Sequence, residues 1–172
     1  MAYLIDSNIF IRSKNEMPMN LWPTFWQRMT DMVNSGELFI STKVKEEIER
    51  GNDELTEWLK HSAPKTCFVG LDGDVMRMYG EVQTWAGTKS FTQTARNVFA
   101  TVADAYLVAT AAAKNMTLVT YEKSNPNSKA RVLIQDACEA VGVNSCDLNA
   151  VLRGLGGVSY PNLTLPTKRN GQ

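Results

Sequence analysis

The sequence of 172 residues has one histidine, His61, and three cysteines, Cys67, Cys138 and Cys146, with no CxxC spacing. A zinc finger would lack ligands, and an odd number of scattered cysteines argues against a disulfide framework. We expect the thiols to be small buried groups. Because His61 lies in a polar stretch, 60–64, that is typical of an exposed loop, a Ser-His-Asp or Cys-His catalytic arrangement is not expected.

A strong net charge and long hydrophobic runs are also missing. Lys+Arg and Asp+Glu are both 18, and the sequence pI is about 6.6. Proteins that coat nucleic acid are normally basic, so contact with nucleic acid would need a local basic rim. No apolar run approaches the roughly 18 residues that cross a bilayer, and Asp6 comes too early for a signal peptide. We therefore expect a cytoplasmic protein with no membrane partner.

Short apolar runs without alternation are separated by helical segments, which predicts an α/β protein with a parallel sheet covered on both faces. The expected strands are 3–5, 38–40, 117–120 and 132–134, with an extended piece at 66–71. The expected helices are 18–35, 43–50, 53–61, 72–86, 90–100, 101–114, 136–141 and 145–153. One domain is expected over 1–153, and the Gly- and Pro-containing segment 154–172 is interpreted as a flexible C-terminal tail or, alternatively, as an arm that binds a partner.

Carboxylates follow two of the expected strands. Asp6 comes directly after 3–5, and Glu122 comes two residues after 117–120. Ligand sites of open parallel sheets lie beyond the carboxyl ends of the strands, so both side chains are expected at the same edge.

Two further acids lie on expected helices. Asp104 is the only charged residue between Ala100 and Ala113, and a buried acid is costly unless it is paired or bound to a cation. The alternative is a capping box in which Thr101 is the N-cap and Asp104 is the third helical residue. Glu47 borders the apolar stripe of its helix, although acids on such a helix more often form a solvated face.

These acids fit one kind of chemistry. Mg²⁺ and similar hard cations prefer oxygen ligands, and three or four carboxylates can hold one or two such ions. A metal-bound water can then attack a phosphate without any histidine, cysteine or covalent nucleophile. Basic side chains near the same edge would bring in the phosphates of a substrate. The candidates are Arg12, Lys14, Lys43, Lys45, Lys123 and Arg131.

The fourth acid has a rival. Asp136 also follows an apolar segment, 132–134, but Glu139 comes three residues later, which is the capping-box arrangement. Glu122 precedes a polar loop and has no comparable structural task in the sequence. We therefore assign Glu122 to the site and a structural role to Asp136.

The same acids resemble a known family pattern. Tyr3-Leu4-Ile5-Asp6-Ser7-Asn8 is similar to the first strand of a PIN domain. The segments 44–51, with Glu47 in the catalytic place, 103–111, with Asp104, and 118–122, with Glu122, resemble the second, third and fourth elements, and the resemblance spans about residues 2–150. Glu122 stands where the family commonly has Asp.

The resemblance implies a three-layer α/β/α sandwich and a Mg²⁺- or Mn²⁺-dependent endoribonuclease. Asp6, Glu47, Asp104 and Glu122 would be the catalytic and metal-binding residues, and Asn8, Arg12, Lys43 and Lys123 would contact RNA. Many relatives are VapC-like toxins and many dimerise, so an antitoxin partner and a homodimer are expectations. The alternatives are a catalytically inactive PIN-like module that binds RNA or protein, and an aspartate-nucleophile phosphatase, which generally has a second Asp where this chain has Asn8.

Overall fold

The computed structural model describes residues 1–154, and in them the strands form one parallel sheet with the order β3-β2-β1-β4-β5. The strands are β1 (Tyr3–Ile5), β2 (Leu38–Ser41), β3 (Phe68–Val69), β4 (Thr117–Val119) and β5 (Ser145–Cys146). The central strand β1 pairs Tyr3 with Leu38 of β2 and with Thr117 of β4. All three of its residues are buried, as expected for a strand covered on both faces.

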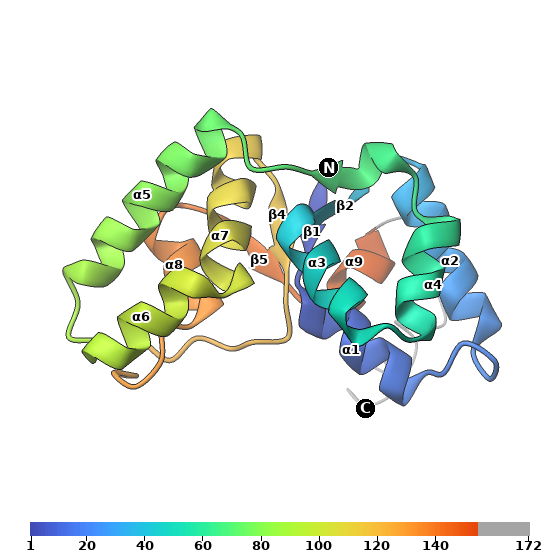
Figure 1. The fold of residues 1–172 in the computed structure, drawn as a ribbon, viewed down its shortest axis with the longest axis horizontal. Helices are drawn as coiled ribbons and strands as arrows, with labels where there is room; N and C mark the ends of the chain where they lie inside the picture. Colours follow the sequence, from blue (N-terminus) through green and yellow to red (C-terminus); the bar gives the residue numbers. More distant parts are fainter. Residues whose placement is uncertain (155–172) are drawn as a thin grey trace, which may run out of the picture.

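Helices cover the sheet on both sides and make the three-layer α/β/α sandwich that the sequence predicts. In order they are α1 (Ser7–Glu16), α2 (Pro23–Asn34), α3 (Thr42–Gly51), α4 (Glu54–Ser62), the short 3-10 helix η1 (Lys65–Cys67), α5 (Gly73–Gly87), α6 (Gln93–Thr101), α7 (Ala103–Lys114), α8 (Ile134–Ala140) and α9 (Leu148–Gly154). Figure 1 shows α5 to α8 gathered at one end of the view and α1, α2, α4 and α9 at the other, with the strands between them.

Short polar side chains start several of these helices. The Asp6 carboxylate accepts the Asn8 backbone N–H and caps α1. The Ser41 hydroxyl accepts the Lys43 N–H and caps α3. Capping satisfies N–H groups that have no partner inside the helix. As a result, the first residues after β1 and β2 are fixed at the edge of the sheet.

Two predictions near the C-terminus are wrong. Residues 132–134 do not form a strand, because Ile134 instead begins α8 and Val132 is a buried residue of the preceding loop. The fifth strand is Ser145–Cys146, inside a stretch predicted to be helical, and it is defined by backbone hydrogen bonds to β4, such as Thr120 N–H to the Cys146 carbonyl at 2.9 Å. Two half-buried residues carry no apolar pattern that predicts this pairing.

The remaining expectations concern the cysteines, membranes and the C-terminus. All three cysteines are free; Cys67 and Cys138 are buried, as predicted, whereas Cys146 is only half-buried. No helix among residues 1–154 is both long and apolar enough to cross a membrane. The predicted tail, 154–172, lies outside the described residues apart from Gly154, which ends α9.

Candidate active site

The Asp6 carboxylate is the most deeply buried acid at the carboxyl edge of the sheet. The residue is 1% exposed, and its backbone N–H continues the ladder to the Val119 carbonyl at 3.0 Å. Burial raises the pKa of Asp6, and Glu122 and Glu47 add to the rise through their negative charge, while hydrogen bonds from Thr120 and Asn8 oppose it. Strand β1 therefore positions a carboxylate whose ionised form depends on a few donors.

Thr120 is a positioning residue that the sequence analysis did not single out. Its hydroxyl donates to Asp6 Oδ2 at 3.0 Å and accepts the backbone N–H of Glu122 at 3.0 Å. Thr120 is buried directly after β4, so it ties the ends of the two central strands together. The signal in the sequence that could have indicated this role is a hydroxyl residue, Thr120, placed directly after the apolar strand that ends at Val119.

Asp104 lies in the first turn of α7, and the structure removes its alternative explanation. Helix α7 begins at Ala103, its N-cap Val102 makes no side-chain cap, and Thr101 belongs to α6, where its hydroxyl donates to the Val98 carbonyl. The capping box expected from Thr101 and Asp104 therefore does not form. Burial, followed by repulsion from Asp6 and Glu122, raises the pKa of Asp104 to about 7.

Glu47 projects from α3 beside the buried stripe of Val44 and Ile48, as predicted, whereas its neighbours Glu46 and Glu49 are exposed. Its Oε2 atom is buried and has no hydrogen-bond partner within the described part of the chain. A buried carboxylate oxygen without a donor is costly. Glu47 also lies close enough to Asp6 and Asp104 to raise the pKa of both.

Glu122 has a structural task that its sequence context did not reveal. One carboxylate oxygen accepts the backbone N–H of Ile134, the first residue of α8, and the other forms an ion pair with Arg131 at 2.7 Å. The Glu122 side chain is 11% exposed, against 60% for Arg131. Glu122 therefore closes the loop between β4 and α8 at both ends.

Asp136, the rival fourth acid, does not form the predicted capping box. It lies in the first turn of α8, whose N-cap Leu133 makes no side-chain cap. Its two oxygens instead accept the Ser124 hydroxyl and the Asn125 backbone N–H. Asp136 does have a structural role, as expected, but it acts by holding the loop after Glu122.

Together Asp6, Glu47, Asp104 and Glu122 form a group that we call the acidic centre. Their charges act on one another, since Asp104 is affected by all three of the others. Across residues 1–154 no three His, Cys, Asp or Glu side chains already stand in the arrangement of a metal site, and Glu122 is turned toward Arg131. The excess negative charge and the unpartnered Glu47 oxygen fit a divalent cation in chemistry, although the ligands would have to converge on it.

Two hollows flank the acidic centre. One, of about 280 Å³, is lined by Glu122 and by two of the predicted RNA-contacting residues, Arg12 and Lys123, together with Asp147. The other, of about 210 Å³, is lined by Asp104 and Arg131. Asp147 follows β5 and was missed because β5 was missed; its carboxylate accepts the Ala150 N–H.

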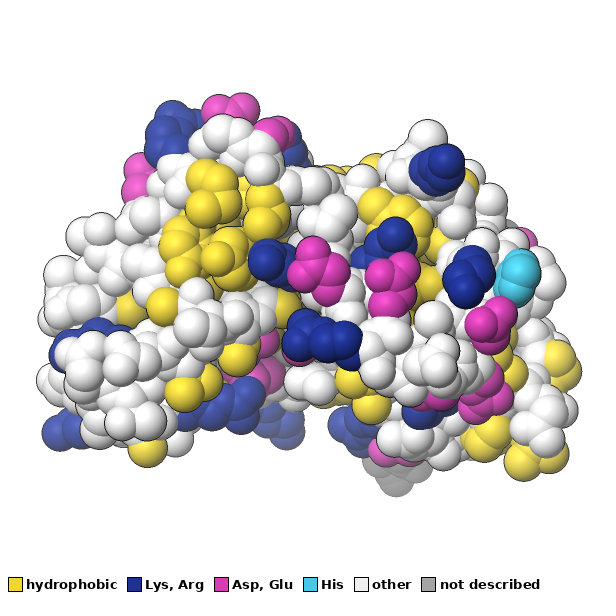
Figure 2. Space-filling model, in the orientation of Figure 1, with side chains coloured by type: hydrophobic (Ala, Val, Ile, Leu, Met, Phe, Trp, Pro, Cys, Tyr) yellow, Lys and Arg dark blue, Asp and Glu magenta, His cyan; other side chains and the backbone are white. Residues whose placement is uncertain are grey.

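The other two predicted RNA-contacting residues lie elsewhere. Asn8 is exposed in the first turn of α1, and the Lys43 ammonium lies 5.0 Å from the centroid of the Tyr106 ring. Neither lines the hollow that holds Arg12 and Lys123. On the face shown in Figure 2, basic and acidic side chains are interspersed near the middle, and a hydrophobic patch lies over α5 and α7.

The fold of the chain is shared with solved structures. The PIN-domain fold predicted from the sequence is confirmed by solved structures that match at 17% identity. VapBC2 from Rickettsia felis, solved bound to a DNA fragment from its promoter, has a TM-score of 0.56 over 86% of this chain and 98% of its own. FitAcB from Neisseria gonorrhoeae has a TM-score of 0.52 over 83% and 95%. FitAB bound to the IR36 DNA fragment has a TM-score of 0.50 over 84% and 94%.

The family is given by the sequence itself. Residues 3–157 match the family described as a domain of unknown function, DUF4411, and the chain belongs to that family. No curated protein matches the chain.

The raised pKa of Asp104 predicts how the metal-free protein responds to pH. The folded protein holds the Asp104 proton more tightly than the unfolded chain, so the folded state loses stability as pH rises from about 4 to about 7. Asp104→Asn should therefore match the wild type near pH 4 and exceed it at pH 8, with a difference that grows by at most about 1.4 kcal/mol per pH unit.

Urea unfolding in chelator, followed at several pH values, measures this difference. Asp74→Asn, which removes an exposed acid from the first turn of α5, controls for the loss of a helix-terminal charge. A stability difference between Asp104→Asn and the wild type that stays constant with pH would contradict the raised pKa.

The contacts of Glu122 give it a structural task that the sequence did not indicate, so its replacement should affect the stability of the fold. Glu122→Ala removes the partners of Ile134 N–H and Arg131 and should lower the free energy of unfolding by about 1–2 kcal/mol. Glu122→Gln keeps an acceptor for Ile134 and loses only the ion pair, so its cost should be about 0–1 kcal/mol. Glu139→Ala, on the exposed side of α8, is the control. Equal melting temperatures for Glu122→Ala and wild type would show that the contacts of Glu122 with Ile134 N–H and Arg131 contribute nothing to the stability of the fold.

Proposed function

We propose that this protein is a Mg²⁺- or Mn²⁺-dependent endoribonuclease that uses Asp6, Glu47, Asp104 and Glu122. The observation that carries the proposal is that four carboxylates, from the residue after β1, from α3, from α7 and from the loop after β4, lie close enough for their charges to act on one another. Such a group is unfavourable by itself, since each negative charge raises the cost of the others. A bound cation would remove that cost.

Two features support a divalent ion with oxygen ligands. The Glu47 Oε2 atom is buried without a donor, and Asp104 has lost the capping-box role that would have explained its position. When bound, the ion lowers the pKa of a coordinated water and stabilises the charge that grows on the phosphate. Asp6 would be its fixed ligand, since Thr120 and Asn8 hold the carboxylate in place.

The surroundings of the acids support an RNA strand as substrate. Arg12 and Lys123 line the hollow beside Glu122, where they would bind phosphates on one side of the scissile bond. The Arg12 guanidinium also lies 4.5 Å from the centroid of the Tyr121 ring, which positions it beside the cleft. Arg12 and Lys123 form a basic group confined to the rim of the acidic centre, which is compatible with a chain that has no net charge.

We further propose that the chain acts as the toxin of a toxin–antitoxin pair, with a small antitoxin protein as partner and a homodimer as the oligomeric state. The support is the likeness in fold to VapBC2 and FitAB, which are VapC-type structures. At 17% identity this likeness is one of fold. Expression of the chain with and without the protein encoded beside it, scored by growth, tests this part separately from the nuclease assay.

The nuclease proposal is tested by a pair of adjacent substitutions on α3. Glu47→Gln should reduce cleavage of single-stranded RNA in Mn²⁺ by roughly two orders of magnitude or more, because it removes a metal ligand. Glu46→Gln, one residue away on the exposed face, should cut like the wild type. Excess chelator should stop the wild type.

Either of two results would contradict the proposal: cleavage of RNA by the wild-type protein in excess chelator, or full activity of Glu47→Gln. The rival, an inactive PIN-like binding module, predicts that wild-type protein binds RNA in chelator, cuts nothing in Mn²⁺, and binds equally well after either substitution.

A further inference from the structure

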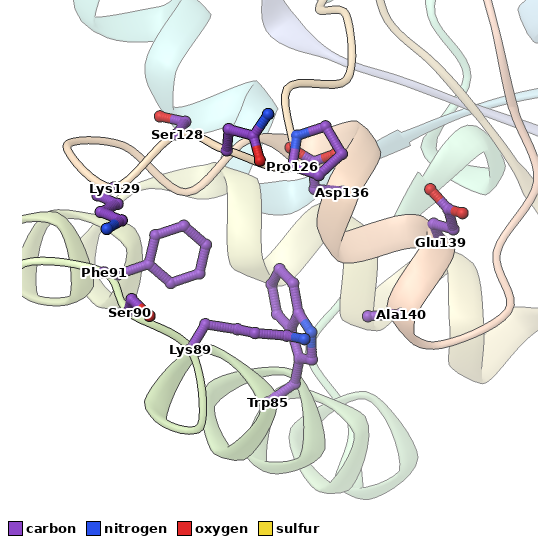
Figure 3. A pocket seen from close by; sticks show the side chains of 11 residues that line it. Trp85, Lys89, Ser90, Phe91, Pro126, Ser128, Lys129, Asp136, Glu139 and Ala140 are labelled. Atoms are coloured by element: carbon purple, nitrogen blue, oxygen red, sulfur yellow. The ribbon is translucent and has the colours of Figure 1, made fainter.

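A further hollow lies outside the acidic centre. It has a volume of about 700 Å³ and lies between the end of α5, the α5–α6 connection, the loop 126–129 and α8. Figure 3 shows the side chains of Trp85 and Phe91 on one side of it, Pro126 and Lys129 on the loop side, and Glu139 on α8. A volume of this size falls within the range of small-molecule sites, roughly 300–1,000 Å³.

Its apolar walls are aromatic and only partly covered. Trp85 and Phe91 meet edge to face with ring centroids 5.8 Å apart, and both rings are half-buried. An edge-to-face pair leaves a ring surface open to a flat ligand that stacks on it. Pro126, which is exposed opposite them, adds a rigid apolar surface.

The polar lining has both signs of charge, and several of these groups are free. Within residues 1–154, the ammonium groups of Lys89 and Lys129 take part in no ion pair, and the Glu139 carboxylate has no hydrogen-bond partner. Lys89 and Lys129 suit a phosphate. A carboxylate only accepts hydrogen bonds, so Glu139 suits a ligand edge that carries N–H groups.

The walls are held in place by hydrogen bonds. The backbone N–H of Thr92 donates to the Lys129 carbonyl at 2.9 Å, which joins the α5–α6 connection to the loop. Asp136 holds the other end of the loop through Ser124 and Asn125. A site that is already formed loses little entropy when it binds a ligand.

The same loop connects this hollow to the acidic centre. It starts at Glu122 and returns to Glu122 through Ile134 N–H and Arg131. The Ser128 hydroxyl, on the lining of the hollow, donates to the Arg131 carbonyl at 3.1 Å. An RNA strand cut at the acidic centre would follow this loop to reach the aromatic rings.

We propose that this hollow binds a nucleobase of the RNA substrate, with the base stacked on Trp85, its phosphate near Lys89 and Lys129, and its N–H edge on Glu139. Guanine fits best, because its N1–H and N2–H donors point in one direction and match the two oxygens of a carboxylate. Uracil, with one N–H between two carbonyl groups, fits worst. The link to RNA cleavage rests on the proposed function, whereas the binding of a base does not.

Tryptophan fluorescence with mononucleotides in chelator tests the site without any cleavage. Guanosine 5′-monophosphate should quench wild-type protein saturably and more strongly than uridine 5′-monophosphate at equal concentration. Trp85→Ala should weaken binding roughly tenfold, a size typical of base stacking. Because this variant also removes a fluorophore, its affinity is measured by calorimetry beside Trp22→Phe, which alters an exposed tryptophan elsewhere and should bind normally.

A second variant separates stacking from edge recognition. Glu139→Gln should retain binding but bring guanosine and uridine monophosphates to similar affinity, and a melting temperature equal to wild type would show that the fold is unchanged. Trp85→Ala with wild-type affinity, or absence of saturable binding by any mononucleotide, would overturn the site even if RNA is cut. If nucleotides bind as expected but the protein cuts no RNA, the proposed base-binding site is supported and the proposed nuclease activity is rejected.

Discussion

The mutual repulsion of buried carboxylates is the constraint around which the carboxyl edge of this sheet is built. Asp6 is almost completely buried. Asp104 on helix α7 and Glu47 on helix α3 lie near it. Each nearby polar group lowers the cost of one of these charges. The Thr120 hydroxyl and Asn8 N–H serve Asp6, and Arg131 and Ile134 N–H serve Glu122. The buried Glu47 Oε2 atom has no such donor within residues 1–154.

This distribution of partners separates the acids into three kinds. Asp6 is held by donors that belong to the strand ends, so its position follows from the sheet itself. Glu122 is held by groups from a loop and from the start of α8, so its position depends on residues outside the sheet. Asp104 and Glu47 are aimed inward by helices whose register is set by their apolar faces. The acidic centre therefore combines one acid held by the strand ends, two acids placed by helices and one acid, Glu122, held by the loop and α8.

Local signals made much of this arrangement predictable. The buried strand 3–5 ends at an acid, the cap Ser41 precedes the helix that carries Glu47, and the spacing of Val44 and Ile48 places Glu47 beside the core. Each of these depends on residues a few positions apart, where periodicity and capping act. The parallel sheet followed from the same short apolar runs.

What could not be predicted depends on partners far along the chain. Strand β5 exists because the backbone of β4 pairs with it, and two residues, Ser145 and Cys146, carry no pattern of their own. Asp104 stands at the second position of α7 because Val102 adopts an extended conformation, with ψ at 167°, that ends α6. The bond from Ile134 N–H to Glu122 spans twelve residues, and nothing local to Glu122 indicates it.

The two contacts of Glu122, with Arg131 and with Ile134 N–H, have a thermodynamic consequence. The same two oxygens that accept bonds from Arg131 and Ile134 N–H are those with which Glu122 would bind a cation, so the two uses would compete if cation binding required Glu122 to turn away from these donors. Any ligand that tightens the loop against Glu122 then disfavours the cation, and any ligand that draws the loop away favours it. Because such coupling is reciprocal, the cation must alter the affinity of the loop's ligand by the same factor. The Glu122 side chain would thereby couple this surface loop to a cation bound at the acidic centre.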